Sequence, residues 1–240
     1  MIKAAGVVIP AHDEEDLLPS CLAAVWQAAG QLPVPVHIVV VADACADRTA
    51  QRARSLGATV VKIGARNVGA ARAAGLGRVI RHTGNLDPAE LWLATTDADT
   101  LVPRYWLARQ AEYAAQGWEA VAGTVSVADW DGHPPRVPAL FQQRYRTRRG
   151  RHPHVHGANL GFSARAYLAA GGFKPLPTAE DHDLVNSLTA AGVPVLRTTR
   201  LPVVTSARTH ARAPSGFGWL LSTLAGLGDD TAPRPQEKSA

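Results

Sequence analysis

Three pairs of aspartates, each separated by one residue, are the first feature of this sequence that could do chemistry. They are Asp97 with Asp99, Asp129 with Asp131, and Asp181 with Asp183. Two carboxylates at such a spacing can hold a hard divalent cation such as Mg²⁺ or Mn²⁺, which prefers oxygen ligands. Chance alone produces about one such pair in a chain of this composition. The elements that position each pair must therefore distinguish them.

The pair Asp97 and Asp99 ends an apolar run, "ELWLATTDAD", that predicts a strand over residues 90–99. Because side chains of a strand alternate, both carboxylates would then lie on one side, although two solvated turn acids would have the same spacing. Asp129 and Asp131 stand before Gly132, which is typical of a solvated turn. Asp181 and Asp183 stand at the start of a predicted helix.

The first hundred residues alternate between short apolar runs and helical patterns. Strands are predicted over 5–9, 36–43, 58–63 and 90–99, and helices over 13–29, 45–57 and 67–84. This alternation is typical of a mostly parallel sheet with helices on both faces. Ligands of such sheets bind beyond the carboxyl ends of the strands. We therefore expect residues 12–14, Asp43 and residues 97–99 to line one crevice.

The second half of the chain is less regular. A helix is predicted over 103–117, a strand or strand pair over 119–130, a basic proline-containing segment over 135–157, a short strand and helix over 158–173, a helix over 179–192 and edge strands over 193–208. We expect a single domain over residues 1–228, with one half over 1–100 and the other over 101–228. Residues 229–240 are predicted to form a disordered tail.

Composition narrows the class of protein. With 46% hydrophobic and 19% charged residues, the chain of 240 residues is typical of a folded α/β protein. The net charge of +5 suits an anionic ligand and does not require nucleic acid. Cys21 and Cys45 lie outside any Cys-x-x-Cys, so they are expected to be buried thiols in a reducing compartment. With neither a signal peptide nor a membrane span, a cytoplasmic protein is expected.

Several segments, taken in order, resemble family 2 glycosyltransferases of the GT-A fold. "VVIPAHDEED" is similar to the family's V-x-I-P-x-x-N-E-E, "VVVADACADRTA" to V-x-D-D-x-S-x-D-x-T, and "TTDADT" to D-x-D. "GANLGFSARAYLAAGGF" is similar to the acceptor-side G-x-N-x-x-x-R-x-x-x-x-x-x-G-G-F, and "AEDHDL" to the E-D motif. The resemblance runs from about residue 5 to residue 220. It implies a Rossmann-like, mostly parallel central sheet flanked by helices, with a smaller mixed acceptor-side region. It also implies that residues 1–100 are the nucleotide-binding half and residues 101–228 the acceptor-binding half.

The sequence departs from this family pattern at a few positions. Asp13 stands where the family usually has Asn, and Ala42 replaces the first Asp of the D-D pair. The family's lysine-bearing segment appears here as "VGAARAAG". These departures affect the expected contacts with the nucleotide base more than the expected binding of a metal ion.

The resemblance implies an inverting, metal-dependent transfer of a sugar from a nucleotide-diphosphate sugar to an acceptor hydroxyl. Asp99 would hold Mn²⁺ or Mg²⁺ and Asp97 would support it, while His210 is a further candidate metal ligand. The residues implied to contact the nucleotide sugar are Pro10, Ala11, Glu14, Asp43, Arg72, Asp97, Asp99, Gly157, Asn159, Arg208 and Arg212. Several of these keep a structural alternative: Asp43 as a helix cap, Glu14 as a first-turn acid, and Arg72 as an exposed helix residue.

The same resemblance makes Asp181 the base that removes the proton of the acceptor hydroxyl, with Glu180 helping to hold the acceptor. Asp183 is a competing candidate. Plain helix-start acidity remains the structural alternative for all three.

Two further segments have open interpretations. His152, His154 and His156 alternate among prolines and arginines, and a mobile acceptor loop is favoured there over a metal site. The arginines around them could face an acidic or lipid-linked acceptor, or only solvent. The apolar stretch "GFGWLLSTLAGL" is too short to span a membrane and could pack on the core, on a partner or on a membrane face, with peripheral contact at the inner side.

Other protein classes fit less well. A sugar-1-phosphate nucleotidyltransferase would need a glycine-rich basic loop after the first strand, where this chain has "PAHDEED". A non-catalytic nucleotide-sugar-binding module would not need Asp181. A Rossmann dehydrogenase would need G-x-G-x-x-G after the first strand, which is not there.

Overall fold

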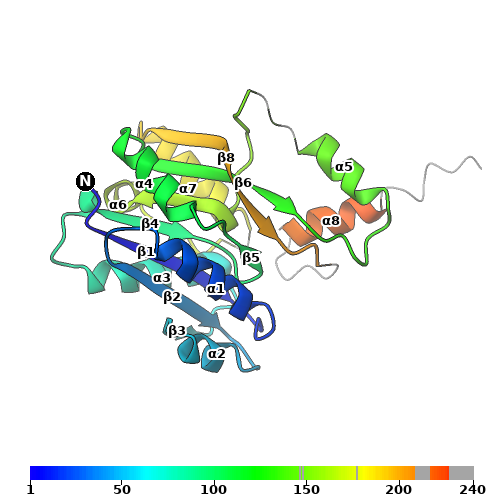
Figure 1. Ribbon diagram of the computed structural model, residues 1–240, viewed down its shortest axis with the longest axis horizontal. Helices are drawn as coiled ribbons and strands as arrows, with labels where there is room; N and C mark the ends of the chain where they lie inside the picture. Colours follow the sequence, from blue (N-terminus) through cyan, green and yellow to red (C-terminus); the bar gives the residue numbers. More distant parts are fainter. Residues whose placement is uncertain (146, 148, 177, 209–216, 227–240) are drawn as a thin grey trace, which may run out of the picture.

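The computed structural model describes residues 1–145, 147, 149–176, 178–208 and 217–226. Within them one eight-stranded sheet has the order β3-β2-β1-β4-β7-β6-β8-β5 (Figure 1). The strands are β1 (Ala4–Ala11), β2 (Val36–Asp43), β3 (Thr59–Ile63), β4 (Leu91–Thr95), β5 (Thr100–Leu101), β6 (Ala120–Val127), β7 (Leu160–Ser163) and β8 (Val195–Thr205). The helices are α1 (Leu18–Ala29), α2 (Thr49–Ser55), α3 (Val68–His82), α4 (Trp106–Ala115), α5 (Val137–Arg144), α6 (Ala164–Ala169), α7 (Glu180–Ala190) and α8 (Phe217–Gly226), with short 3₁₀ turns η1 (Pro88–Glu90) and η2 (Gly157–Asn159).

The first four strands form the parallel half of the sheet. β1 pairs in parallel with both β2 and β4, and β2 pairs in parallel with β3. β7 then runs antiparallel between β4 and β6, while β6 and β8 are parallel. The predicted α/β class, with a mostly parallel sheet and a mixed second region, is confirmed. The carboxyl ends of β1, β2 and β4 accordingly meet at one edge.

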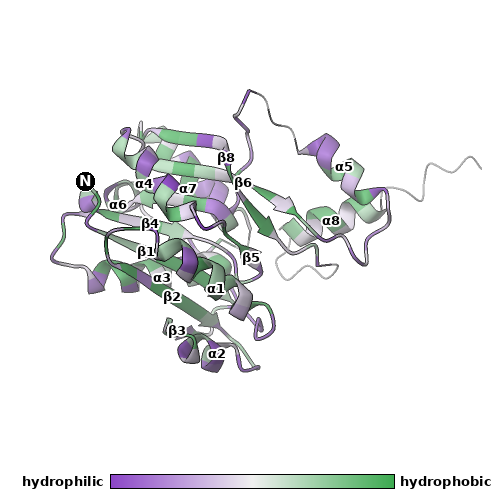
Figure 2. Ribbon diagram, viewed as in Figure 1, coloured by the Kyte–Doolittle hydropathy of each residue, from purple (hydrophilic) through white to green (hydrophobic). Residues whose placement is uncertain are grey.

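The two faces of the sheet bury separate halves of the core. Along β1, Ala5, Val7 and Ile9 face α1 and α4, whereas Ala4 and Val8 face α3 and α7. Successive strand side chains point to opposite faces, so a strand covered on both sides reads as one continuous apolar run. Figure 2 shows these inner strands as mainly hydrophobic, with hydrophilic residues gathered on helices and loops.

Helix α3 lies unusually close to the sheet. A Cβ on Gly75 would come within 2.4 Å of Val8 and 2.8 Å of Val41, and a Cβ on Gly6 would come within 2.3 Å of Val79. Only glycine allows this approach of helix and strand backbones. The close packing fixes the position of α3, which supplies Arg72 to the site described below.

Several predicted boundaries are wrong. α1 begins at Leu18, so the acids from Asp13 to Asp16 lie in the loop before it and not in its first turn. β4 ends at Thr95, so Asp97 and Asp99 stand in a turn beyond the strand, and strand alternation does not position them. β8 is one eleven-residue strand between β6 and β5, and not a set of edge strands.

The basic segment and the apolar stretch near the end of the chain pack together. Residues 137–144, which belong to the basic proline-containing segment without a predicted helix, form α5, which lies beside α8 (Figure 1). Val137 and Phe141 pack with Ala207, Leu221 and Leu224 in a small third core. The stretch around α8 therefore packs on this chain. Within the described residues, no helix combines the length and apolarity needed to cross a membrane.

Candidate active site

Arg72 joins the end of β4 to the start of α7. Its Nη2 donates to Asp97 Oδ1 at 2.6 Å, and its Nη1 donates to the carboxylate of Glu180. The Arg72 side chain is only 3% exposed, and its guanidinium lies 5.7 Å from the centre of the Phe173 ring. Burial alone would lower the pKa of Arg72, but Asp97 and Glu180 outweigh it and the pKa is raised. Arg72 is thus a permanently charged bridge, and the alternative of an exposed helix arginine is wrong.

Arg208 forms a second bridge over the neighbouring carboxylates. It contacts Glu14 through both guanidinium nitrogens, at 2.8 and 3.2 Å, and its Nη2 lies 2.5 Å from Asp99 Oδ2. Burial raises the pKa of Asp99; the guanidinium of Arg208 opposes this, and repulsion from Asp97 and Glu14 adds to it. The loop after β1, the turn after β4 and the end of β8 are therefore tied together by one cation.

Asp181 stands at the start of α7, beside the Arg72 bridge. Its Oδ2 accepts the backbone N–H of Gly157 at 2.8 Å, and its Oδ1 accepts that of His182 at 2.7 Å. Two amide donors stabilise the ionised form of a carboxylate and fix its direction. Asp181 and the side chains joined by the Arg72 and Arg208 bridges form a group that we call the carboxylate–arginine cluster. Its members are Glu14, Arg72, Asp97, Asp99, Glu180, Asp181 and Arg208. Asp183, the competing acid, instead pairs with Lys174.

Gly157 is the residue that allows Arg72 to lie where it does. A Cβ at this position would come within 2.4 Å of three atoms of the Arg72 guanidinium. The Gly157 carbonyl also accepts the hydroxyl of Thr95 at 2.5 Å, which anchors η2 to the end of β4. Glycine is required here by the arginine, whereas the sequence prediction explained it by the approach of a sugar.

Glu180 and Asn159 lie deeper than the sequence prediction implies. Glu180 is 6% exposed and contacts Arg72; burial raises its pKa, and Arg72 opposes that effect. Asn159 is 1% exposed, accepts the Trp106 indole N–H, and donates to the carbonyls of Thr124 and Leu201. The hydrogen bonds described for Glu180 and Asn159 are all made with other residues of this chain.

Asp43, at the end of β2, organises a backbone loop. Its two oxygens accept the amides of three successive residues, Ala65, Arg66 and Asn67, at 2.7 to 2.8 Å. The side chain is 4% exposed. Asp43 therefore does not serve as the cap of α2. Its carboxylate instead fixes the turn that leads from β3 into α3, the helix whose N-cap is Asn67.

We expect Asp43→Ala to lower the free energy of unfolding by about 3 kcal/mol, because three amides would lose their acceptor. Asp87→Ala is the matched control, since the exposed Asp87 accepts one amide, from Ala89, and should cost about 1 kcal/mol. Chemical denaturation of both variants measures the difference. Equal costs, together with loss of nucleotide binding in Asp43→Ala alone, would restore a ligand-binding role for Asp43.

The remaining predicted residues divide into three groups. Pro10 and Ala11 are the last residues of β1 and pair with Val41 and Ala42 of β2. Asp129 accepts the Asp131 amide in an exposed turn, as predicted. His210 and Arg212 lie outside the described residues, as does the predicted tail at 229–240.

The three alternating histidines form a ladder of stacked rings with Tyr145. The ring centres of Tyr145 and His154 are 4.0 Å apart and those of His154 and His156 are 6.1 Å apart. Burial lowers the pKa of His156 to about 4, although Asp181 opposes the effect, so the ring is neutral near pH 7. Among the described residues, this ladder does not form a group with metal-ligand spacing.

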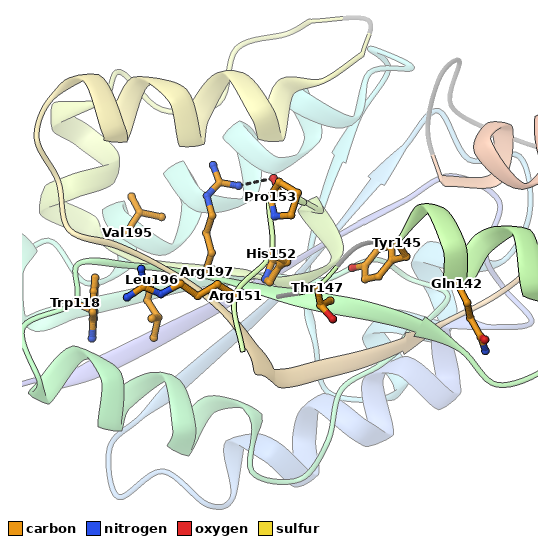
Figure 3. A pocket seen from close by; sticks show the side chains of 10 residues that line it. All are labelled: Trp118, Gln142, Tyr145, Thr147, Arg151, His152, Pro153, Val195, Leu196 and Arg197. Carbon is orange, nitrogen blue, oxygen red and sulfur yellow. Dashed lines mark hydrogen bonds between the residues drawn. The ribbon is translucent and has the colours of Figure 1, made fainter. Parts of the chain in front are cut away.

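A cavity of about 900 Å³ lies beside the start of β8 and is also lined by the segment that follows α5. Figure 3 shows Trp118, Tyr145 and His152 among its lining, with Arg151 and with Arg197, which donates to the Pro153 carbonyl at 2.7 Å. No member of the cluster lines it. Tyr145 connects the two regions, because its hydroxyl is 3.0 Å from His156 Nε2, next to Gly157.

The cluster can offer a divalent cation two carboxylates, but it does not supply a complete set of ligands. Asp97 and Asp99 offer the oxygen ligands that Mg²⁺ and Mn²⁺ prefer, and such ions commonly take their other ligands from water and phosphate. Both carboxylates contact arginines in this structure. The sequence did not indicate these pairings, nor the hydroxyl of Thr95.

Comparisons with known proteins give the family and the fold of this chain. Residues 6–169 match the model of the family described as "Glycosyl transferase family 2". No curated protein matches the sequence. Among solved structures, Staphylococcus aureus TarS 1–349 in complex with UDP-GlcNAc has a TM-score of 0.62 at 13% identity, over 95% of this chain and 66% of that one.

Two further structures have a similar fold. A mannosyltransferase from Pyrobaculum calidifontis, in complex with GDP-Man and Mn²⁺, has a TM-score of 0.61 at 20% identity, over 93% of this chain and 69% of that one. Glucosyl-3-phosphoglycerate synthase from Mycobacterium tuberculosis, in complex with Mn²⁺, UDP and glucosyl-3-phosphoglycerate, has a TM-score of 0.56 at 17% identity, over 93% and 76%. This chain spans 36% of a longer TarS structure. These likenesses identify the GT-A fold.

Proposed function

Because the chain belongs to glycosyl transferase family 2, we propose that it moves a sugar from a nucleotide-diphosphate sugar to an acceptor hydroxyl, with inversion and with a divalent metal. One observation carries the proposal: Arg72 brings Asp97, in the turn after β4, next to the start of α7, where Asp181 stands. The proposed donor site and the proposed base would thereby be held next to each other. Such positioning of two reactants is a large part of catalysis.

The donor side consists of Asp97, Asp99 and Arg208. Asp99 would hold Mn²⁺ or Mg²⁺ with support from Asp97, and the ion would neutralise the charge of the departing diphosphate. The guanidinium of Arg208 would bind phosphate oxygens, for which its planar fork is well suited. The solved structures with UDP-GlcNAc, or with GDP-Man and Mn²⁺, support a nucleotide sugar and a divalent ion as ligands.

The acceptor side consists of Asp181 and the residues around it. Asp181 would take the proton of the acceptor hydroxyl as its oxygen attacks the anomeric carbon. The amides of Gly157 and His182 donate to this carboxylate and fix its direction. Glu180, bound to Arg72, acts on this arrangement by positioning and not by holding the acceptor. We further propose that residues 1–100 bind the donor and 101–228 the acceptor, within one domain.

The acceptor is proposed to be anionic and to lie along the cavity beside the start of β8. Arg151 and Arg197 line this cavity, and the Tyr145–His156 contact leads from it towards Gly157 and Asp181. An acidic head group on a lipid would also fit this chemistry. Trp219, 49% exposed on α8, would then give a peripheral membrane contact.

Arg151→Glu tests the anionic acceptor. The change places a negative charge in the cavity, so the KM for the acceptor should rise about tenfold while the KM for the donor stays within twofold. Arg109→Glu, on the exposed face of α4, is the matched charge reversal away from the cavity. An effect on the donor KM alone would reject the acceptor role of this cavity.

A thermal-shift screen of nucleotide sugars tests the proposed function itself. A matching nucleotide-diphosphate sugar with Mn²⁺ should raise the melting temperature by several degrees, since a ligand that binds only the folded state stabilises it. The stabilising donor should then release its nucleoside diphosphate during turnover. Stabilisation by a nucleoside triphosphate with a sugar 1-phosphate, and release of pyrophosphate, would instead indicate a nucleotidyltransferase. Binding without turnover by any acceptor would indicate a binding module.

A further inference from the structure

Three metal-ligating side chains meet at the carboxyl ends of β1 and β2, outside the carboxylate–arginine cluster. The ligand atoms of His12, Asp13 and Cys45 all lie within 4.8 Å of one another. His12 Nε2 is 3.7 Å from Asp13 Oδ2, and both side chains are 37% exposed. In the part of the chain that the structure describes, no other group of three or more His, Cys, Asp or Glu side chains has its ligand atoms this close together.

The surroundings of His12 select the nitrogen that can bind a metal. Its Nδ1 lies 2.7 Å from the backbone carbonyl oxygen of Asp43. A carbonyl oxygen only accepts, so Nδ1 carries the hydrogen and the lone pair of the neutral ring is on Nε2. Metal-bound histidines usually have this arrangement, with the second ring nitrogen donating to a carbonyl or carboxylate. The lone pair of Nε2 is on the side of the ring that faces Asp13.

Asp13 and Cys45 are oriented in a comparable way by the backbone. Asp13 Oδ1 accepts the amides of Ala46 and Asp47, at 2.7 and 3.3 Å, while its Oδ2 is the oxygen nearer His12. Cys45 Sγ lies 3.5 Å from the Asp13 amide. The loop that carries Cys45 is thereby joined to the loop that carries the other two ligands.

Both loops also contain strained backbone. Asp13 has a φ of 52° and Ala44 has a φ of 51°, in the left-handed region that is costly for residues with a Cβ. Such strain, of order 1–3 kcal/mol per residue, persists at ligand-binding and catalytic sites where the surrounding contacts impose it. Here the strained backbone places the Asp13 carboxylate next to the His12 imidazole and the Cys45 thiol next to the Asp13 amide.

We propose that His12, Asp13 and Cys45 form a second metal site that takes a borderline-soft transition ion of the Zn²⁺ class. A nitrogen, an oxygen and a sulfur ligand suit Zn²⁺ or Co²⁺, whereas Mg²⁺ and Mn²⁺ prefer sites made of oxygen. Tetrahedral Zn²⁺ with bonds of about 2.0–2.3 Å needs its ligand atoms about 3.3–3.7 Å apart, so a side-chain movement of about 1 Å suffices. The partly exposed position leaves the fourth coordination place to water. The site does not depend on the proposed glycosyl transfer.

Co²⁺ is a direct probe, because coordination by a thiolate gives an intense near-ultraviolet charge-transfer absorption. Titration of the full chain should produce this band, and Zn²⁺ should remove it by competition with a Kd of about 1 µM or tighter. Cys45→Ser should abolish the band, and His12→Gln should weaken Co²⁺ binding at least tenfold. Cys21→Ala, which removes the other, buried cysteine, should leave the band intact, as should Asp99→Asn.

Absence of the band in the wild type, or its persistence in Cys45→Ser, would overturn the proposal. Circular dichroism and melting curves of each variant separate lost ligands from lost folding. A second measurement needs no variant: Zn²⁺ should slow alkylation of the partly exposed Cys45 at least tenfold, as read by mass spectrometry. An unchanged alkylation rate would equally reject the site.

Discussion

Replacing Asp181 by asparagine is expected to lower the rate constant for sugar transfer by about 10²–10⁴-fold while leaving the donor bound. The carboxamide has the same shape but cannot accept the proton of the acceptor hydroxyl. One of its two polar atoms can still accept an amide, from Gly157 or from His182, so the start of α7 should keep its position. The folded protein should lose about 1 kcal/mol of stability.

The measurement compares release of nucleoside diphosphate with and without acceptor in wild type and variant. Asp183→Asn is the matched control: it lies in the same helical turn and carries the same charge, but it pairs with Lys174 at the surface. It should transfer sugar at the wild-type rate. If Asp183→Asn lost activity and Asp181→Asn kept it, the base would have to be reassigned.

Asp99→Asn is expected to weaken binding of the donor about 100-fold in the presence of Mn²⁺. The amide is a poor ligand for a hard cation, and the change also removes one anion facing Arg208. Folding should be little affected, because Arg208 keeps its two contacts with Glu14 and remains charge-paired. In a chelator, wild type and variant should bind the nucleotide diphosphate equally weakly.

Isothermal titration calorimetry with and without Mn²⁺ measures this difference. Asp131→Asn is the control with the same local sequence pattern, since Asp131 lies in an exposed turn with the Asp-x-Asp spacing. Its donor affinity should equal that of the wild type. Wild-type affinity that is equal in Mn²⁺ and in chelator would contradict the metal role of Asp99.

Much of this architecture could be predicted because it depends on local patterns. The continuous apolar runs of β1, β2 and β4 reflect burial on both faces, and their parallel order brings residues 12–14, 43 and 97–99 to one edge of the sheet. The resemblance of the motifs to family 2 glycosyltransferases is confirmed by the family match over residues 6–169. The roles that the resemblance implies for Asp97, Asp99 and Asp181 stay predictions.

The partners of these residues could not be predicted, because they come from distant parts of the chain. Nothing near Arg72 in the sequence shows that it meets Glu180, and nothing near Glu14 shows that it meets Arg208. The sequence around Asp43 is compatible with a carboxylate that contacts a ligand and with one that stabilises a loop. The structure shows the second, because Asp43 accepts the backbone amides of residues 65–67. The end of β4 was predicted four residues too late, since the polar turn continued the strand pattern.

The Arg208 contact with Asp99 has a consequence for the order in which ligands bind. The guanidinium already neutralises the carboxylate that is proposed to hold the metal, so a cation arriving alone must displace it. A diphosphate offers Arg208 a replacement partner and offers the cation further oxygens. Metal and nucleotide should therefore show positive thermodynamic coupling, each tightening the other by the same factor. Under the proposed function, Arg208 would oppose binding of the metal alone, and the diphosphate of the donor would remove that opposition.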